Sequence, residues 1–226
     1  MGYEYNEYNS GRGGFLSSIP PVTKNIVAIN ILVFIATLIN ENFMVVNFAM
    51  FYPASPFFKP WQILTHMFMH GGFWHIFFNM YSLLMFGSIL ERSLGTKKYL
   101  IFYFVTGLGA VALHTGVEWM QARVFIANGA VEAYQQLLIT PTLGASGAIY
   151  GVLIGFAMLY PQARLTLIFP PIPMTAKWLV IIFAAIELFS GINGIQDGVA
   201  HFAHLGGMLF GWLLIRWWRK HGKLYY

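Results

Sequence analysis

Long apolar stretches with almost no charge determine what this chain can fold into. Of its 226 residues, 58% are hydrophobic and only 9% are charged, whereas a soluble domain has about a quarter of its residues charged. The bilayer must therefore be the solvent for most of the protein. Crossing the hydrocarbon takes roughly 20 mostly apolar residues per helix, so six spans would use most of the chain and leave no room for a separate soluble domain.

The apolar runs predict an all-α membrane protein, a bundle of six transmembrane helices. We expect the spans at residues 25–39, 74–90, 99–117, 146–160, 177–190 and 199–218. The fourth and fifth are short for spanning helices, which favours tilt, local thinning or a re-entrant path. The membrane domain is then expected over residues 23–219, between a polar N-terminal tail (1–22) and a basic, aromatic C-terminal tail (220–226).

The basic residues predict the orientation. With a cytoplasmic N-terminus, 11 of the 13 Lys and Arg residues fall on the cytoplasmic side, and only Lys59 and Arg123 fall outside. This is the asymmetry of the positive-inside rule. We therefore expect both termini in the cytoplasm, the protein in the plasma (inner) membrane, and a long outer loop (40–73) between the first two spans. The net charge of +5 is explained by this topology, so no nucleic-acid partner is expected.

A serine and a histidine near the starts of two spans suggest chemistry. Ser146 lies in the sequence Gly-Ala-Ser-Gly where the fourth span begins, and His204 lies about one helical turn inside the sixth. Both spans are expected to start at the outer face, so the two side chains have the same shallow depth. Such a pair can form a nucleophile and its base. The alternative is that Ser146 only packs, whereas a histidine within a membrane is a functional candidate by default.

Small residues provide a way to bring these two spans together, because they let helix backbones approach closely in lipid. Tyr150 follows Ser146 by four residues on the same helical face. It is a core aromatic on one interpretation and a stacking partner for the histidine on the other. The glycines at four-residue spacing are Gly147, Gly151 and Gly155 in the fourth span and Gly207 and Gly211 in the sixth.

Polar side chains also gather around the start of the second span. His66 and His70 share a face if their stretch is helical, and His75 and Asn79 begin the span from the outer side. Donors at this level would stabilise a developing oxyanion. The same histidines, with His201, also have the spacing of metal ligands. Spacing alone leaves the hydrolase and the metal site open.

In combination, these motifs resemble the rhomboid family of intramembrane serine proteases, in its six-span bacterial form. The resemblance runs from about Trp61 to Gly211, with the motifs in the family's order. The segment 144–147 with Tyr150 resembles the nucleophile motif, and Ala-His-Leu-Gly-Gly at 203–207 resembles the histidine motif. The segment 87–95, which contains Glu91, resembles the turn at the inner end of the second span.

The resemblance implies a serine endopeptidase without metal or other cofactor. Ser146 would be the nucleophile and His204 the base, in a two-residue site. The oxyanion would be received by His75, Asn79 and the backbone N–H of Ser146, while Gly144, Tyr150 and Gly207 support the site. No acidic third member is expected, because Glu187 in the fifth span and Asp197 in an outer link match no catalytic position of the family.

The same resemblance implies the substrates and the sidedness of the site. The partners would be single-span membrane proteins, met within the lipid bilayer and cut in or beside their spans at small residues. The active site would open toward the extracytoplasmic side. One departure is Gln62, where many members have arginine after the tryptophan; that arginine is structural, so the change puts the anchoring of the outer loop in question.

Two alternatives to a protease are open from the sequence. One is a non-catalytic rhomboid-like protein that binds client proteins in the membrane. The other is a metal-dependent membrane enzyme that uses His66, His70, His75 and His201. Inactive relatives lose the serine or the histidine, and this chain keeps both.

Overall fold

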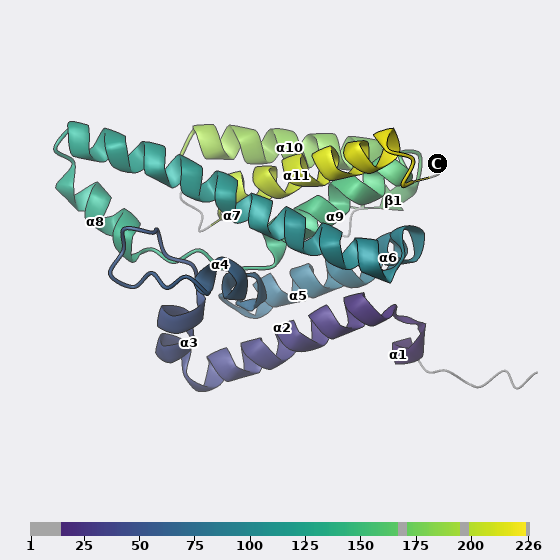
Figure 1. Cartoon of the computed structure of the whole chain (residues 1–226), viewed down its shortest axis with the longest axis horizontal. Helices are drawn as coiled ribbons and strands as arrows, with labels where there is room; N and C mark the ends of the chain where they lie inside the picture. The colour runs from purple at the N-terminus through teal and green to yellow at the C-terminus, as the bar shows by residue number, and fades with distance from the viewer. Residues whose placement is uncertain (1–14, 167–170, 195–198, 225–226) are drawn as a thin grey trace, which may run out of the picture.

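The computed structural model describes residues 15–166, 171–194 and 199–224, and helices dominate them (Figure 1). The described elements, in chain order, are α1 (Phe15–Ser18), α2 (Pro21–Ile39), α3 (Glu41–Phe48), α4 (Gln62–Thr65), the 3₁₀ turn η1 (His66–Phe68), α5 (Phe73–Ser82), the π-helical turn η2 (Leu83–Gly87), α6 (Ser88–Leu94), α7 (Thr96–Ala127), α8 (Val131–Ile139), α9 (Ser146–Leu159), β1 (Arg164–Thr166), β2 (Pro173–Thr175), α10 (Ala176–Ile192) and α11 (His201–Lys220).

Each of the six expected apolar segments is helical. The largest difference is α7, which ends at Ala127 rather than at the predicted residue 117. The apolar run stops at Glu118, but the residues that follow it are good helix formers, so loss of hydropathy does not mark the end of the helix. Among the described residues, three helical segments are long and apolar enough to cross a membrane, namely Pro21–Ile39, Phe73–Leu94 and Thr96–Ala127, and Ser146–Leu159 is apolar but shorter.

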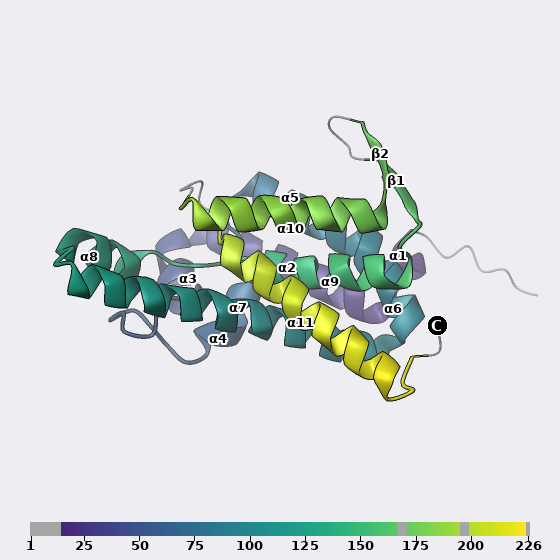
Figure 2. The same ribbon diagram turned by 90° about the horizontal axis from the view of Figure 1, so that it is seen from above.

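The described structure is mostly helical, as predicted, and the link between α9 and α10 is an exception. There β1 and β2 form a two-stranded antiparallel sheet, with Leu165 opposite Met174, and Figure 2 shows it projecting beyond the start of α10. The strands are only three residues long and contain one of the link's prolines. Their pairing depends on contacts across the link, which leave no periodic signal in so short a stretch.

The centre of the bundle is the packing of α11 against α7 and α9 (Figure 2). The glycines predicted to form a close contact do so, because a Cβ added to Gly207 would lie only 1.8 Å from the carbonyl oxygen of Gly147. A Cβ on Gly151 would meet Thr106 of α7 at 2.4 Å. The backbones of α9 and α11 therefore touch, as small residues allow in membrane helices.

Glu91 fastens α6 to the start of α2. Its carboxylate is buried and accepts hydrogen bonds from the backbone N–H groups of Val22 (3.0 Å) and Thr23 (2.8 Å) and from the Thr23 hydroxyl (2.8 Å). The first N–H groups of a helix have no partner within the helix and carry a partial positive charge. A carboxylate satisfies both requirements, which gives the motif at 87–95 a structural role here.

Gln62 anchors the long loop between α2 and α5. Its side chain is fully buried, its amide Nε2 donates to the carbonyls of Val46 (3.0 Å) and Phe57 (3.1 Å), and its Oε1 accepts from the backbone N–H of Lys59 at 3.0 Å. The amide thus holds three segments of the loop together without the arginine that many family members have there. A neutral anchor needs no charged partner in this buried position.

Candidate active site

The N-terminal ends of α9 and α11 bring Ser146 and His204 together. Ser146 is the first residue of α9, and His204 lies in the first turn of α11. The serine Oγ lies 2.7 Å from His204 Nε2. Just before α9, Gly144 has a φ of +136°, and its N–H donates to the carbonyl of His66 at 3.0 Å. The chain therefore enters α9 through a conformation that glycine adopts without strain.

Tyr150 stacks on His204, which is the second of the two interpretations that its sequence position allows. The ring centroids are 4.1 Å apart and the planes differ by 7°. Ser146 and Tyr150 thus contact the same imidazole from successive turns of α9. The stacking limits rotation of the ring, so the Nε2 atom stays directed at the serine.

Glu187 of α10 brings a carboxylate to the same histidine. Its Oε1 lies 2.9 Å from His204 Nδ1 and accepts a 2.5 Å hydrogen bond from the Tyr150 hydroxyl. Nδ1 of His204 makes no hydrogen bond in this arrangement, so its contact with Glu187 is electrostatic. The sequence predicts no acidic third member of the site, whereas the structure places this carboxylate beside His204. Asp197 lies outside the described residues.

His201 holds the other oxygen of the same carboxylate. Its Nδ1 lies 2.6 Å from Glu187 Oε2, and both side chains are buried, with 8% and 5% of their surface exposed. His201 is thus tied to Glu187, one turn before His204 on α11. Of these two histidines, His204 is the one that lies at hydrogen-bond distance from the serine.

The two expected oxyanion residues, His75 and Asn79, lie on successive turns of α5. A Cβ added to Gly144 would lie 2.9 Å from His75 Nε2 and 3.5 Å from Ser146 Oγ, so these two groups flank the same small space. Asn79 lies one turn further along α5, where its amide Nδ2 donates to the carbonyl of His75 at 2.8 Å. The structure brings His75 next to the turn before Ser146, and Asn79 supports the α5 backbone behind it.

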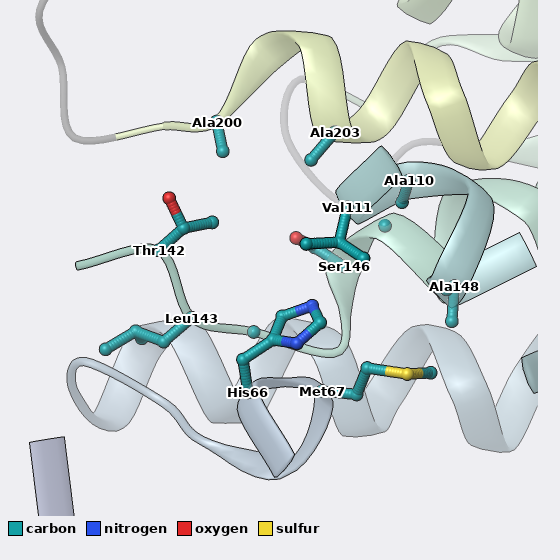
Figure 3. A pocket seen from close by; sticks show the side chains of 13 residues that line it. His66, Met67, Ala110, Val111, Thr142, Leu143, Ser146, Ala148, Ala200 and Ala203 are labelled. Carbon is teal, nitrogen blue, oxygen red and sulfur yellow. The ribbon is translucent and has the colours of Figure 1, made fainter. Parts of the chain in front are cut away.

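A small pocket opens beside Ser146 (Figure 3). Its walls come from α7, α9, α11 and the segments before α5 and α9. Most of the lining side chains are short or absent, and the figure shows His66 and Ala203 on opposite sides of the serine. The small residues in the lining are Gly107, Ala110, Gly144, Gly147, Ala148, Ala200 and Ala203.

The histidines considered as metal ligands make different contacts and do not converge on one point. His66 Nδ1 lies 2.9 Å from the carbonyl of Gln62, His70 packs edge-on against His75, and His201 contacts Glu187. The helix ends at η1, so His66 and His70 do not share a helical face as expected. Over the described ranges, no three His, Cys, Asp or Glu side chains come close enough to hold a metal ion.

Burial keeps the two loop histidines neutral. It lowers the pKa of His66 to about 4, with a smaller contribution from nearby His114. It lowers the pKa of His70 to about 3, with a contribution from His75. Neutral imidazoles at these positions are consistent with a packing role beside the site.

Comparison with known proteins gives one consistent result. A model of the rhomboid domain matches residues 57–220. The mitochondrial Rhomboid protein 1 of Saccharomyces cerevisiae is 30% identical over 157 residues, which cover 68% of this chain and 41% of the yeast protein. Rhomboid protease AarA of Providencia stuartii is 29% identical over 161 residues, 68% of this chain and 54% of AarA. Rhomboid protease GlpG of Yersinia pestis is 25% identical over 203 residues, 89% of this chain and 64% of GlpG. The chain spans less than two thirds of the length of these three relatives.

Proposed function

The chain belongs to the rhomboid family, and on that basis we propose that this integral membrane protein is an intramembrane serine endopeptidase with Ser146 as its nucleophile. The single observation that carries the proposal is the 2.7 Å contact between Ser146 Oγ and His204 Nε2. A hydroxyl at hydrogen-bond distance from an imidazole nitrogen is the arrangement that activates a serine. Two relatives with the word protease in their names, AarA and GlpG, support the same assignment.

The proposed reaction is acyl transfer to Ser146. The serine Oγ attacks the carbonyl carbon of the scissile peptide bond while His204 Nε2 accepts its proton. The C–N bond then breaks as His204 returns the proton to the leaving amine, and water releases the acyl group from Ser146 by the same two steps.

The transition state needs donors for the oxyanion. The backbone N–H of Ser146 is in the first turn of α9, where N–H groups have no partner within the helix. His75 flanks the space beside Gly144, and Asn79 holds the next turn of α5. We assign these three groups to oxyanion stabilisation, for which one donor is typically worth ~3 kcal/mol.

The substrates we propose are single-span membrane proteins cut at small residues. The pocket beside Ser146 has a volume of only about 20 Å³, so a short substrate side chain fits where a long one meets the walls. A helix in lipid satisfies its own backbone hydrogen bonds and must unwind locally before it can be cut. Substrates with helix-breaking residues near the outer face should therefore be cleaved fastest.

The experiment that tests this function is labelling by a fluorophosphonate probe together with cleavage of a model single-span substrate. The purified wild type should be labelled and should cut the substrate. Ser146→Ala and His204→Ala should abolish cleavage while the thermal unfolding of the protein stays close to that of the wild type. Full cleavage by Ser146→Ala would refute the proposal, and absence of labelling in the folded wild type would favour a non-catalytic rhomboid-like protein.

We propose six spans, with both termini in the cytoplasm of a plasma (inner) membrane and the site opening to the opposite side. The chain has no cysteine, so single cysteines report sidedness without background. Cysteine in place of exposed Glu132 on α8 should react with a membrane-impermeant maleimide in intact cells. Cysteine in place of exposed Lys97 should react only after lysis, and the reverse pattern would invert the topology.

A further inference from the structure

A carboxylate from one membrane helix reaches the imidazole of another at this site, and we propose that Glu187 is a positioning residue for His204. On this proposal the site is a set of three residues, Ser146, His204 and Glu187, rather than a pair. The proposal rests on the serine endopeptidase function proposed above. It gives a catalytic purpose to a glutamate that the family motif does not include.

The first argument is that each ring nitrogen of His204 has its own partner. Nε2 faces Ser146 Oγ at 2.7 Å and Nδ1 faces Glu187 Oε1 at 2.9 Å. To accept the serine proton at Nε2, the neutral ring must carry its hydrogen on Nδ1. A carboxylate beside Nδ1 favours that tautomer, and it also stabilises the imidazolium that forms when the proton is taken.

The second argument is that Glu187 is held in place by its other contacts. Tyr150 donates to Oε1 at 2.5 Å and His201 Nδ1 lies 2.6 Å from Oε2. The side chain is only 5% exposed, and an unpaired carboxylate is costly inside a membrane protein. Here both oxygens have partners, so the charge has a defined position. Tyr150 contacts both the carboxylate and the face of the imidazole.

The third argument is that the remaining surroundings of His204 supply no other acid. On α9 the facing polar groups are Ser146 and Tyr150, and on α5 His75 is the nearest charged or titratable group. The α7 segment packed against this part of α11 presents glycine, alanine and leucine. Among the described residues, Glu187 is therefore the acid that contacts the imidazole.

The test is Glu187→Gln, which keeps the shape and hydrogen-bonding capacity of the side chain and removes its charge. We expect kcat/KM for a single-span substrate to fall by about 10- to 1,000-fold, mostly through kcat. Removing the charge of a triad acid costs about 10⁴-fold in a serine protease with a linear hydrogen bond, and the contact here is less well aligned. The acidic limb of the pH profile should move to lower pH, because a neutral amide stabilises the imidazolium less.

Two further variants separate positioning from folding. Glu91→Gln removes another buried carboxylate, on α6, which bonds to the start of α2 and does not contact Ser146 or His204. It should lower the temperature of unfolding without moving the pH profile. If Glu187→Gln does not fold, Glu187→Asp keeps the charge but draws it back from His204. It should retain the wild-type acidic limb with a several-fold lower kcat, and an unchanged kcat would overturn the proposal.

The outcomes distinguish this proposal from the function on which it rests. A wild type that neither labels nor cleaves refutes the endopeptidase, and the role of Glu187 falls with it. An active wild type with a Glu187→Gln variant of equal kcat/KM and equal pH profile refutes only the positioning role. A lowered kcat with a shifted acidic limb, absent in Glu91→Gln, supports both.

Discussion

Substitution of Gly207 by alanine should inactivate the protein from a position that does not touch the catalytic atoms. The added Cβ would lie 1.8 Å from the carbonyl oxygen of Gly147 and 2.8 Å from its carbonyl carbon. Both atoms belong to the backbone of α9, so no side chain can rotate away to make room. Relief requires the two helices to move apart.

The required movement can be worked from the same distances. Cβ atoms essentially never approach other atoms within 3.0 Å, so relief of a 1.8 Å contact requires α9 and α11 to move apart by about 1.2 Å. Gly147 follows Ser146 directly, and Gly207 lies three residues after His204, so the displacement acts at the site itself. Ser146 Oγ and His204 Nε2 are 2.7 Å apart. A displacement of this size lengthens their distance to as much as about 3.9 Å, beyond hydrogen-bond range.

The assay is the rate of Ser146 labelling by a fluorophosphonate probe, measured beside thermal unfolding in detergent. Gly207→Ala should label at least 100-fold more slowly, with a loss of stability of at least the ~1–3 kcal/mol typical of overpacked interiors. Gly211→Ala should have a smaller effect, since its nearest contact is the side chain of Ile154 at 2.8 Å. Gly116→Ala meets nothing within 4 Å and should behave as wild type. A Gly207→Ala protein with wild-type labelling and stability would show that the α9–α11 contact does not set the geometry of the site.

Three further predictions concern stability and the turn before the serine. Burial lowers the pKa of His70 from 6.5 to about 3, so the stability that this neutral imidazole contributes is complete above pH 6.5 and is lost as the pH falls toward 3. The loss is ~2 kcal/mol at pH 5, and His70→Phe should reduce the difference between unfolding temperatures at pH 7 and pH 5. Gly144→Ala should cost about 1–3 kcal/mol because of its positive φ and, by pressing on His75 at 2.9 Å, should slow cleavage; equal activity would argue against a role for that contact. Glu91→Gln should lower the free energy of unfolding by about 2 kcal/mol, because it weakens charge-assisted hydrogen bonds to the start of α2, while the labelling rate of the remaining folded protein stays unchanged.

The helical segments could be predicted because the physics that forms them is local. An apolar run in a bilayer must satisfy its backbone hydrogen bonds internally, so each run becomes a helix. The ends of the helices are harder to predict from the sequence. The apolar run in α7 ends near residue 117 while the helix continues to Ala127, since hydropathy reports the solvent around a helix and propensity decides where it stops. The β1–β2 pairing depends on contacts across a link and left no periodic signal.

The proximity of Ser146 and His204 could be predicted for a different reason. The glycine spacings on α9 and α11 predict that the two helices touch, and the charge distribution predicts that both begin on one side. These two constraints fix the relative depth of the serine and the histidine. The helical repeat of α9 places Tyr150 on the same face as Ser146. The spacing of the histidines does not distinguish metal ligands from histidines that only pack, because the difference depends on the direction in which each ring points.

The contact of Glu187 with His204 is not predicted by the family motifs, because none of them includes this glutamate. The physical signal is present in the sequence: a carboxylate within an apolar span is costly and needs partners, and the polar groups nearest in depth are Tyr150, His201 and His204. That criterion predicts a partner for Glu187 without predicting which one. The structure adds that the acid and the base lie on different helices, so the orientation of His204 depends on α10 staying against α11. One side of α10 carries exposed Ile186 and Phe189, with no helix covering them in the described part of the chain. A movement of α10 away from α11 would therefore withdraw the carboxylate from His204.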